Sequence, residues 1–557
     1  MLHLTTARTA LLRLLSVPLL LPLLAVVACT DLTETVYDQI TEKNFKPTAR
    51  DLGSLIAPAY AVLADMYMGW YGIVDVAQEE PADVLVTPER VNGWWDGGVY
   101  YRQHTHSWSL NSWTFDHTWT NCFSSVNNVN RVIYQIESGT IPVTNDSAKA
   151  GILAELRALR AYDYSLLLDD FRNVPIVTDF TAKDLPQQNT AQEVYDFVVS
   201  ELTAVIPGLS KEAGVAMYGR MNRWAAEAIL ARVYLNADVY VGTSAYDKVI
   251  PLTRDIIDSG KYALDPSYRT PFSVAAGPLD GGQSHEVIWA VPYDHVYLPV
   301  SSFHMKTLKP ELKYVFNLVY EPWGGSAGNP QFVDSYDPDD HRKQDTWLMG
   351  SHFTAGAQFG YNFTDTIPQF RGPNAFRLGF PVWKYEIYSG ETGSSDVDYP
   401  IVRYAEVLMM QAEALLRTGQ ADAAAALVTR VRQRAFAATN PAKATVTGVD
   451  LMQGSTYLYG WYDTDGVVKT GPGGTPVTAT TGGAFGGADI QYGRFLDELG
   501  WEFAVEGHRR QDLIRFGVFS TKAWFNHAAD ADTHWRIYPI PQSAIDANPN
   551  LKQNPGY

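Results

Sequence analysis

Hydrophobic side chains recur at helical spacing along most of this 557-residue chain. Apolar residues three and four positions apart mark one face of an amphipathic α-helix. This pattern covers residues 52–66, 119–136, 152–166, 194–205, 224–235 and 404–415, with further helices expected near 245–259 and 420–436. Asn189 and Thr190 provide a cap before the helix at 194–205, and Gly419 provides a stop signal. The chain is therefore predicted to be mostly α.

Two of these segments, 224–235 and 404–415, resemble each other. Each alternates large and small side chains, with Ala228, Ala231 and Ala412 placed where a neighbouring helix would cross. Such alternation in paired antiparallel helices is typical of tetratricopeptide repeats. Residues 266–400 are instead rich in Pro, Gly and aromatics with short β-like runs. We therefore predict a tetratricopeptide-like helical-repeat scaffold with a loop-rich variable subdomain and short β-hairpins.

The N-terminus has the pattern of a secretory signal. Arg8 and Arg13 precede an apolar run that ends at Ala28, and Cys29 follows. The sequence Val26-Val27-Ala28-Cys29 resembles a bacterial lipobox, which implies removal of residues 1–28 and lipidation of Cys29. Residues 29–48 then form a tether. The alternative is a secreted protein with a cysteine at its cleavage site.

Composition excludes several classes of protein. The chain has 61 acidic and 43 basic residues, a net charge of −18, and no run of Lys or Arg. This balance argues against a nucleic-acid partner. Two cysteines cannot form a disulfide framework or a cysteine-based zinc site. Cys122 lies on an apolar helix face and is expected to be buried. No motif indicates a cofactor.

Aromatic side chains are concentrated in one part of the chain. Five of the 15 tryptophans lie between residues 94 and 119. Trp94 and Trp95 follow Asn92 in a glycine-rich segment, which favours a surface loop. A sugar ring requires a flat aromatic surface beside hydrogen-bonding groups, so this loop is a candidate glycan-binding site. Trp119 fits a helix core, whereas the pattern leaves Trp108 and Trp113 undecided.

Four motifs occur in an order that resembles the SusD/RagB family of nutrient-binding outer-membrane lipoproteins. They lie at 332–342, 399–408, 501–517 and, in two parts, 538–541 with 554–557. The resemblance implies four tetratricopeptide-like units and a lipid-anchored position on the surface of a Gram-negative bacterium. It also implies a complex with a SusC-like TonB-dependent transporter. Members of the family bind glycans or, in the RagB branch, peptides, and are not enzymes.

The resemblance also implies where a ligand binds. Family ligand contacts come from a loop that corresponds here to 92–96, which gives Asn92, Trp94 and Trp95. Loops of the variable subdomain add Tyr320 and Trp323, with Tyr297 as a further candidate.

The mature chain is divided into 49–265, the variable region 266–400, and 401–557 with a surface insertion at 448–489.

Charged clusters elsewhere are interpreted as structural. We expect a lattice of ion pairs between helices, in which Glu506 reaches Arg509 or Arg510 at helical spacing. It comprises Glu502, Glu506, Arg509, Arg510, Asp512 and Arg515.

No metal site is expected. Asp463 and Asp465 begin a calcium-like loop whose twelfth position is Gly474. Asp337, Asp339 and Asp340 are expected to cap or turn the chain. His104 and His106 share one face if they lie on a strand, but lack a third ligand nearby in the sequence.

Two alternatives to glycan capture remain. One is capture of peptides by the same fold, for which a groove with charged anchors would fit better than an aromatic loop. The other is an all-helical glycoside hydrolase, which needs two carboxylates flanking the aromatics. Glu79, Glu80 and Asp83 are the residues to test for that role, and they are otherwise expected to form a solvated helix end.

Overall fold

The computed structural model describes residues 52–278, 280–354, 360–368, 370–462, 469–470, 478 and 482–557. The predicted signal, Cys29 and the tether lie outside these residues, as do Asp463 and Asp465. Among the described helices, none alone has the length and hydropathy of a membrane span. The segments Leu52–Met68 and Ile73–Glu79, bent by 54°, meet those criteria only as a pair.

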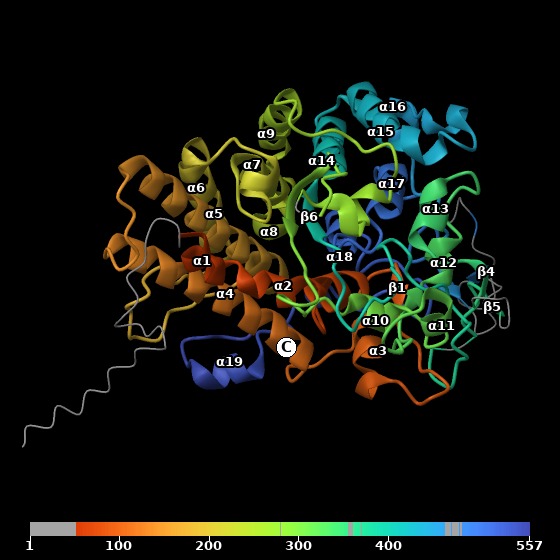
Figure 1. Ribbon diagram of the computed structural model, residues 1–557. Coiled ribbons are helices and arrows are strands. Elements are labelled where there is room, and N and C mark those ends of the chain that lie inside the picture. The colour runs from red at the N-terminus through yellow and green to blue at the C-terminus, as the bar shows by residue number, and fades with distance from the viewer. Residues whose placement is uncertain are drawn as a thin grey trace, which may run out of the picture. The chain divides into compact units, whose positions relative to one another are not determined.

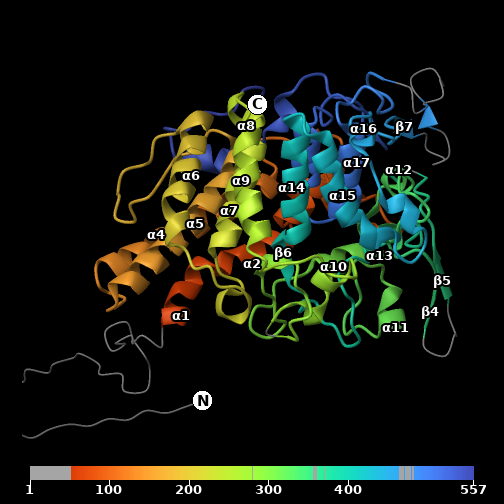
Figure 2. The same cartoon turned by 90° about the horizontal axis from the view of Figure 1, so that it is seen from above.

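A row of long helices forms the body of the chain (Figure 1 and Figure 2). Along the row, each helix packs against the next. The row consists of α4 (Trp113–Glu137), α5 (Asp146–Phe171), α6 (Ala191–Val205), α7 (Arg223–Leu235), α9 (Tyr246–Asp258), α14 (Tyr404–Arg417) and α15 (Ala421–Phe436). Because α9 packs against α14, the row continues across the irregular segment between them. The predicted helical-repeat fold is confirmed.

Local signals explain where these helices begin and end. Thr190 caps α6 in a capping box with Glu193. Gly419 follows α14 with φ +82°, a left-handed conformation that glycine adopts without strain. Cys122 is fully buried on α4, as predicted.

The region between α9 and α14 contains short elements. They are β2 (Val287–Val291), α10 (Phe303–Thr307), α11 (Leu312–Phe316), β3 (Ala327–Gly328), α12 (Pro330–Val333), α13 (His341–Thr346), β4 (Gly350–Phe353), β5 (Gly360–Phe363) and β6 (Tyr399–Arg403). Strands β4 and β5 pair antiparallel, as do β2 and β6, where Val287 lies opposite Arg403. The pairing of β2 with β6 ties both ends of the region together.

The N-terminal part runs through α1 (Leu52–Ile56), α2 (Ala61–Met68), the π-helical segment Ile73–Glu79, β1 (Leu85–Val86) and α3 (Val99–His104). Strand β1 pairs antiparallel with β3, with Leu85 opposite Gly328. This pairing brings the loop after β1 beside the loop before β3, two segments more than 200 residues apart in the sequence.

The C-terminal part adds α16 (Gly448–Leu451), β7 (Trp461–Tyr462), β8 (Lys469–Thr470), α17 (Gly493–Phe503), α18 (Arg509–Arg515) and α19 (Gln542–Ala547). Within the predicted insertion at 448–489, residues 463–468, 471–477 and 479–481 lie outside the described residues. Helices α16 and α17 contact each other, as do α17 and α18. One large hydrophobic cluster, which runs from Ile56 to Leu551, joins the N-terminal and C-terminal parts.

Candidate functional site

Five aromatic side chains from four segments meet at the protein surface, and we call them the aromatic platform. The platform comprises Trp70, Tyr71, Trp94, Trp113 and Trp323. The ring centroids of Trp70 and Trp323 lie 4.4 Å apart, and those of Trp70 and Tyr71 lie 5.5 Å apart. Trp113 meets Tyr71 edge-on at 3.6 Å. Trp70 is 46% exposed and Trp113 is 41% exposed, so these rings present area to solvent.

A buried tyrosine supports the platform from beneath. The Tyr100 ring stacks with Trp94 at 5.8 Å and with Tyr71 at 6.1 Å. Lys306 Nζ lies 3.7 Å from the centroid of the Tyr100 ring and pairs with the buried carboxylates of Asp75 and Glu80. The aromatic rings are therefore held by a fixed support rather than by one another alone.

Tyr71 and Asp96 have left-handed backbones, with φ +64° and +47°. Such conformations are costly for residues other than glycine. The Tyr71 hydroxyl donates a hydrogen bond to Asp96 Oδ2 at 2.7 Å, which links the two strained turns. Burial, followed by the Asp96 carboxylate, raises the pKa of the Tyr71 phenol above its usual range. A carboxylate therefore lies directly beside the exposed rings.

Arg90 fixes the loop that carries Trp94. Its fully buried guanidinium donates to the Gly325 carbonyl at 3.0 and 2.8 Å and to the Leu378 carbonyl at 2.9 Å. The Trp94 ring lies so close to Gly325 that a Cβ there would be 2.5 Å from it. Asn92 is exposed, and its Oδ1 accepts the Trp94 backbone N–H at 3.0 Å. Arg90 therefore holds the loop of Trp94 beside the loop of Trp323.

The structure separates the predicted site residues into two groups. Trp94 and Trp323 belong to the platform, and Asn92 shapes its edge. Trp95 points away from the platform and packs against Tyr101 and Phe370, with Arg371 over its ring.

Tyr320 and Tyr297 are exposed, by 56% and 86%. Tyr297 lines a separate apolar cavity of about 380 Å³ beside α1 and α2, which no platform residue lines.

Sequence reasoning missed Trp70 and Tyr71 and left Trp113 undecided. Trp70 and Tyr71 stand between Gly69 and Gly72, and this pattern of two aromatics in a glycine-bounded turn could have indicated them. Trp108 and Trp119 are buried, so Trp119 is confirmed as core and Trp108 joins it.

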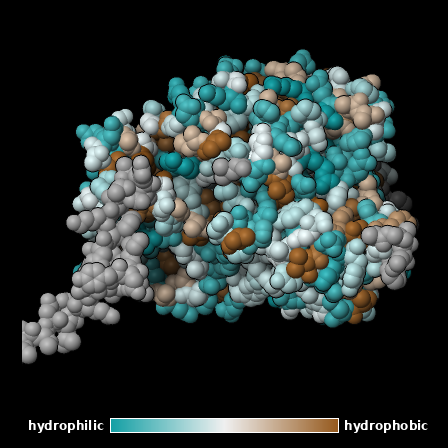
Figure 3. All heavy atoms as spheres, in the orientation of Figure 1, coloured by the Kyte–Doolittle hydropathy of each residue, from teal (hydrophilic) through white to brown (hydrophobic). Residues whose placement is uncertain are grey.

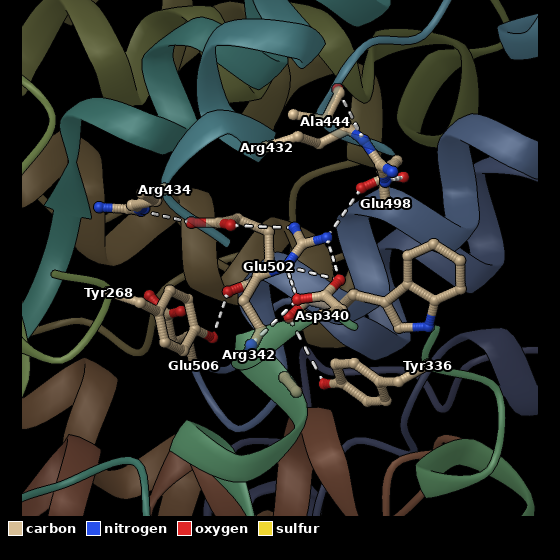
Figure 4. Close-up of polar contacts among 12 residues, drawn as sticks. Tyr268, Tyr336, Asp340, Arg342, Arg432, Arg434, Ala444, Glu498, Glu502 and Glu506 are labelled. Carbon is tan, nitrogen blue, oxygen red and sulfur yellow. Dashed lines mark hydrogen bonds and ion pairs between the residues drawn. The ribbon is translucent and has the colours of Figure 1, made fainter. Parts of the chain in front are cut away.

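The C-terminal motif forms a buried ion-pair network (Figure 4). Glu502 on α17 accepts from Arg403 at 2.8 Å, from Arg434 at 2.6 Å and from Arg342 at 3.1 Å. Glu498 pairs with Arg342 and Arg432. The network joins α13, α15, α17 and β6, which confirms the predicted structural role.

The partner predicted for Glu506 was wrong. Glu506 lies between α17 and α18, where Val505 has φ +64°, so helical spacing does not apply. Its carboxylate pairs with Lys384 and Arg403. Arg509 pairs instead with Asp83, and Arg510 pairs with Asp169.

The carboxylates considered for hydrolysis are buried, so the predicted solvated helix end was wrong. Glu79, Glu80 and Asp83 are all fully buried. Burial raises the pKa of Glu79 to about 8, although the Gly507 N–H donates to it at 2.7 Å. Glu80 bonds to Thr87 and Lys306, and Asp83 bonds to Arg509.

The remaining acidic motif behaves as expected. Asp340 caps α13, and Asp337 accepts the Asp339 backbone N–H.

On the face drawn in Figure 3, strongly hydrophobic residues are scattered among hydrophilic ones rather than gathered in one broad patch.

Fold and site together define a helical-repeat protein with an exposed cluster of aromatic side chains. One family model, described as the SusD family, matches residues 285–557. A second, described as starch-binding and associating with the outer membrane, matches residues 46–235. The chain belongs to the SusD family.

Individual proteins of known sequence or structure also resemble this chain over most of its length. The starch-binding protein SusD of Bacteroides thetaiotaomicron is 24% identical over 520 residues, which cover 85% of this chain and 84% of that protein. A SusD superfamily structure from Parabacteroides distasonis superposes with a TM-score of 0.67 at 19% identity, covering 92% and 100% of the two chains. Surface glycan-binding protein A of B. thetaiotaomicron, in complex with laminarihexaose, gives 0.63 at 21% identity, covering 91% and 100%.

Proposed function

We propose that this protein captures a glycan on the aromatic platform without hydrolysing it. The carrying observation is that Trp70 and Trp113 remain substantially exposed while packed in a rigid aromatic cluster. Aromatic faces match the C–H faces of sugar rings, and the Asp96 carboxylate and the Asn92 amide supply polar partners at the edge.

The size of the surface fits weak, reversible capture. Each ring that covers about 50–100 Å² of apolar sugar surface contributes ~1–3 kcal/mol. Ordering the ligand offsets much of this, so two or three rings give a Kd in the millimolar-to-micromolar range. Such binding allows the cargo to be released.

Names of similar proteins support a glycan ligand. The SusD relative is described as starch-binding, and a structural neighbour was solved with laminarihexaose. From family membership we infer further that lipidated Cys29 anchors the chain in the outer membrane, facing outward. There it delivers the glycan to a SusC-like TonB-dependent transporter.

Burial of the nearby acids supports binding rather than catalysis. A glycoside hydrolase needs two carboxylates that reach the scissile bond and a water. Glu79, Glu80 and Asp83 each have fixed partners inside the protein. A peptide ligand is the second candidate, and the Asp96 carboxylate beside the platform is a charged group that a peptide amine could use.

The test is a glycan-array screen of residues 30–557 with reducing-end analysis of the bound sugar. We expect oligosaccharide binding that Trp94→Ala weakens and no release of reducing ends over hours. Trp95→Ala should leave binding largely intact while lowering the Tm, because Trp95 packs against Phe370. Hydrolysis abolished by Glu80→Gln, or capture of peptides alone, would contradict the proposal.

A further inference from the structure

Three side chains from distant parts of the sequence form a buried cluster beside Trp108, Phe519 and Trp524. They are His106, after α3, and His527 and Asp530, near the C-terminus. The side chains of these residues are at most 4% exposed. One nitrogen or oxygen atom from each lies within 4.8 Å of the others. Helix α3 ends at His104, so the predicted pairing of His104 and His106 on a strand does not occur.

Hydrogen bonds to backbone carbonyls orient both imidazole rings. His527 Nδ1 lies 2.9 Å from the His104 carbonyl oxygen, and His106 Nε2 lies 2.8 Å from the Pro81 carbonyl oxygen. A carbonyl only accepts, so each of these nitrogens carries its proton. In a neutral ring, the other nitrogen then has a lone pair.

Both remaining nitrogens face the same carboxylate. His106 Nδ1 lies 3.0 Å from each Asp530 oxygen, and His527 Nε2 lies 4.0 Å from Asp530 Oδ1. His527 Nε2 is buried and has no hydrogen-bond partner among the described residues. Lone pairs therefore converge on one point, an arrangement that a cation stabilises.

We propose that His106 Nδ1, His527 Nε2 and the Asp530 carboxylate bind one Zn²⁺ ion. Two imidazoles and a carboxylate form a ligand set that zinc commonly takes, with water in the fourth position. Metal-bound histidines usually donate their second N–H to a carbonyl or carboxylate, as both do here. Since its ligands come from two distant segments, the ion would clip the turn after α3 to the C-terminal segment. The clip would fix the base of the helix that carries Tyr100.

The test is metal analysis of the purified full chain, with Co²⁺ as a spectroscopic probe. We expect one equivalent of Zn²⁺ per chain and, after exchange, the intense visible absorption of tetrahedral Co²⁺. Both signals should be lost in His527→Gln and Asp530→Asn. They should persist in His104→Gln, a matched buried histidine outside the cluster. Zn²⁺ should raise the Tm of the metal-free wild type by a few degrees and leave that of His527→Gln unchanged.

Two outcomes would overturn the proposal. One is a wild-type chain that binds neither Zn²⁺ nor Co²⁺, in which case His106 and Asp530 form a simple ion pair. The other is binding that disappears only in His295→Ala, since Asp294, His295 and Asp396 form a second, exposed group. If the buried variants fail to fold, the equivalents bound by the wild type and by His295→Ala decide the question.

Discussion

The contact of Trp94 with Gly325 sets one edge of the aromatic platform. Gly325 has no left-handed backbone requirement, so alanine is conformationally allowed there, but its Cβ would lie 2.5 Å from the indole. We expect Gly325→Ala to displace Trp94 and lower glycan affinity by about tenfold, or ~1.4 kcal/mol, as measured by isothermal titration calorimetry. Gly393→Ala is the control, because its nearest neighbour is 3.7 Å away. Equal affinities in the two variants would contradict this role of Trp94.

Glu79 gives the protein a pH-dependent stability. Its pKa is raised to about 8 in the folded state, chiefly by burial, from an ordinary value of 4.5. The contribution of the protonated Glu79 carboxyl to the free energy of unfolding is therefore complete below about pH 4.5, and it is lost as the pH rises through 8. Between these values the free energy of unfolding should increase by about 1.4 kcal/mol per pH unit as the pH falls. Urea unfolding at pH 6, 7 and 8 gives the free energy of unfolding at each pH. This free energy should change less with pH in Glu79→Gln than in the wild type, and an equal pH dependence would refute the raised pKa of Glu79.

Sequence patterns predicted some residues of the aromatic platform correctly and included one, Trp95, that does not belong to it. Trp94 and Trp323 were found because they stand in glycine-rich loops, where side chains reach the surface. Trp95 has the same setting, yet its ring packs against Phe370 rather than joining the platform. Whether an aromatic side chain of a loop faces outward depends on contacts with residues far away in the sequence, such as Phe370 for Trp95 and Gly325 for Trp94.

The elements of the C-terminal half are joined by charges rather than by apolar contacts alone. Glu502 is held by Arg342, Arg403 and Arg434, which come from α13, β6 and α15. Burial opposes ionisation of Glu502, but these arginines hold its pKa well below the usual range. Removing the carboxylate would take a shared buried negative charge away from three guanidinium groups, which would keep only their other partners, among them Glu286, Glu498 and Glu506.

We expect Glu502→Ala to lower the free energy of unfolding by about 3–5 kcal/mol. Denaturant titration measures the change. Lys443→Ala, which breaks exposed pairs with Asp337 and Asp339, should have no measurable effect. A Glu502 variant as stable as the wild type would show that helix packing alone holds these elements.

Helices were predictable and their connections were not. The apolar period predicted α4, α5, α6, α7 and α14, because each buries one face against its neighbours, and the repeat pattern predicted α9 and α15 as their second helices. The pairing of β1 with β3 has no local signal, since each strand has two residues. The partner of Glu506 was missed for a related reason: the chain leaves the helix at Ala504, and partners then depend on tertiary contacts.

The proposed lipid anchor, Cys29, lies in the segment before residue 52. If Cys29 is lipidated, Cys29→Ala should shift the protein from the membrane fraction to the soluble fraction and abolish incorporation of labelled palmitate. Glycan affinity should not change, because the platform lies within residues 70–323. Retention of the variant in the outer membrane would contradict anchoring through Cys29.

Glycan binding by the whole chain is the central claim, and α4 offers an internal control for it. Trp113 begins this helix in the platform, whereas Tyr134, 44% exposed, lies about 30 Å further along it. The direct measurement is calorimetric titration of residues 30–557 with laminarihexaose and starch oligosaccharides. We predict millimolar-to-micromolar binding of at least one sugar, at least tenfold weaker in Trp113→Ala and unchanged in Tyr134→Ala. Equal binding by both variants, or no binding of any glycan by the wild type, would contradict the account.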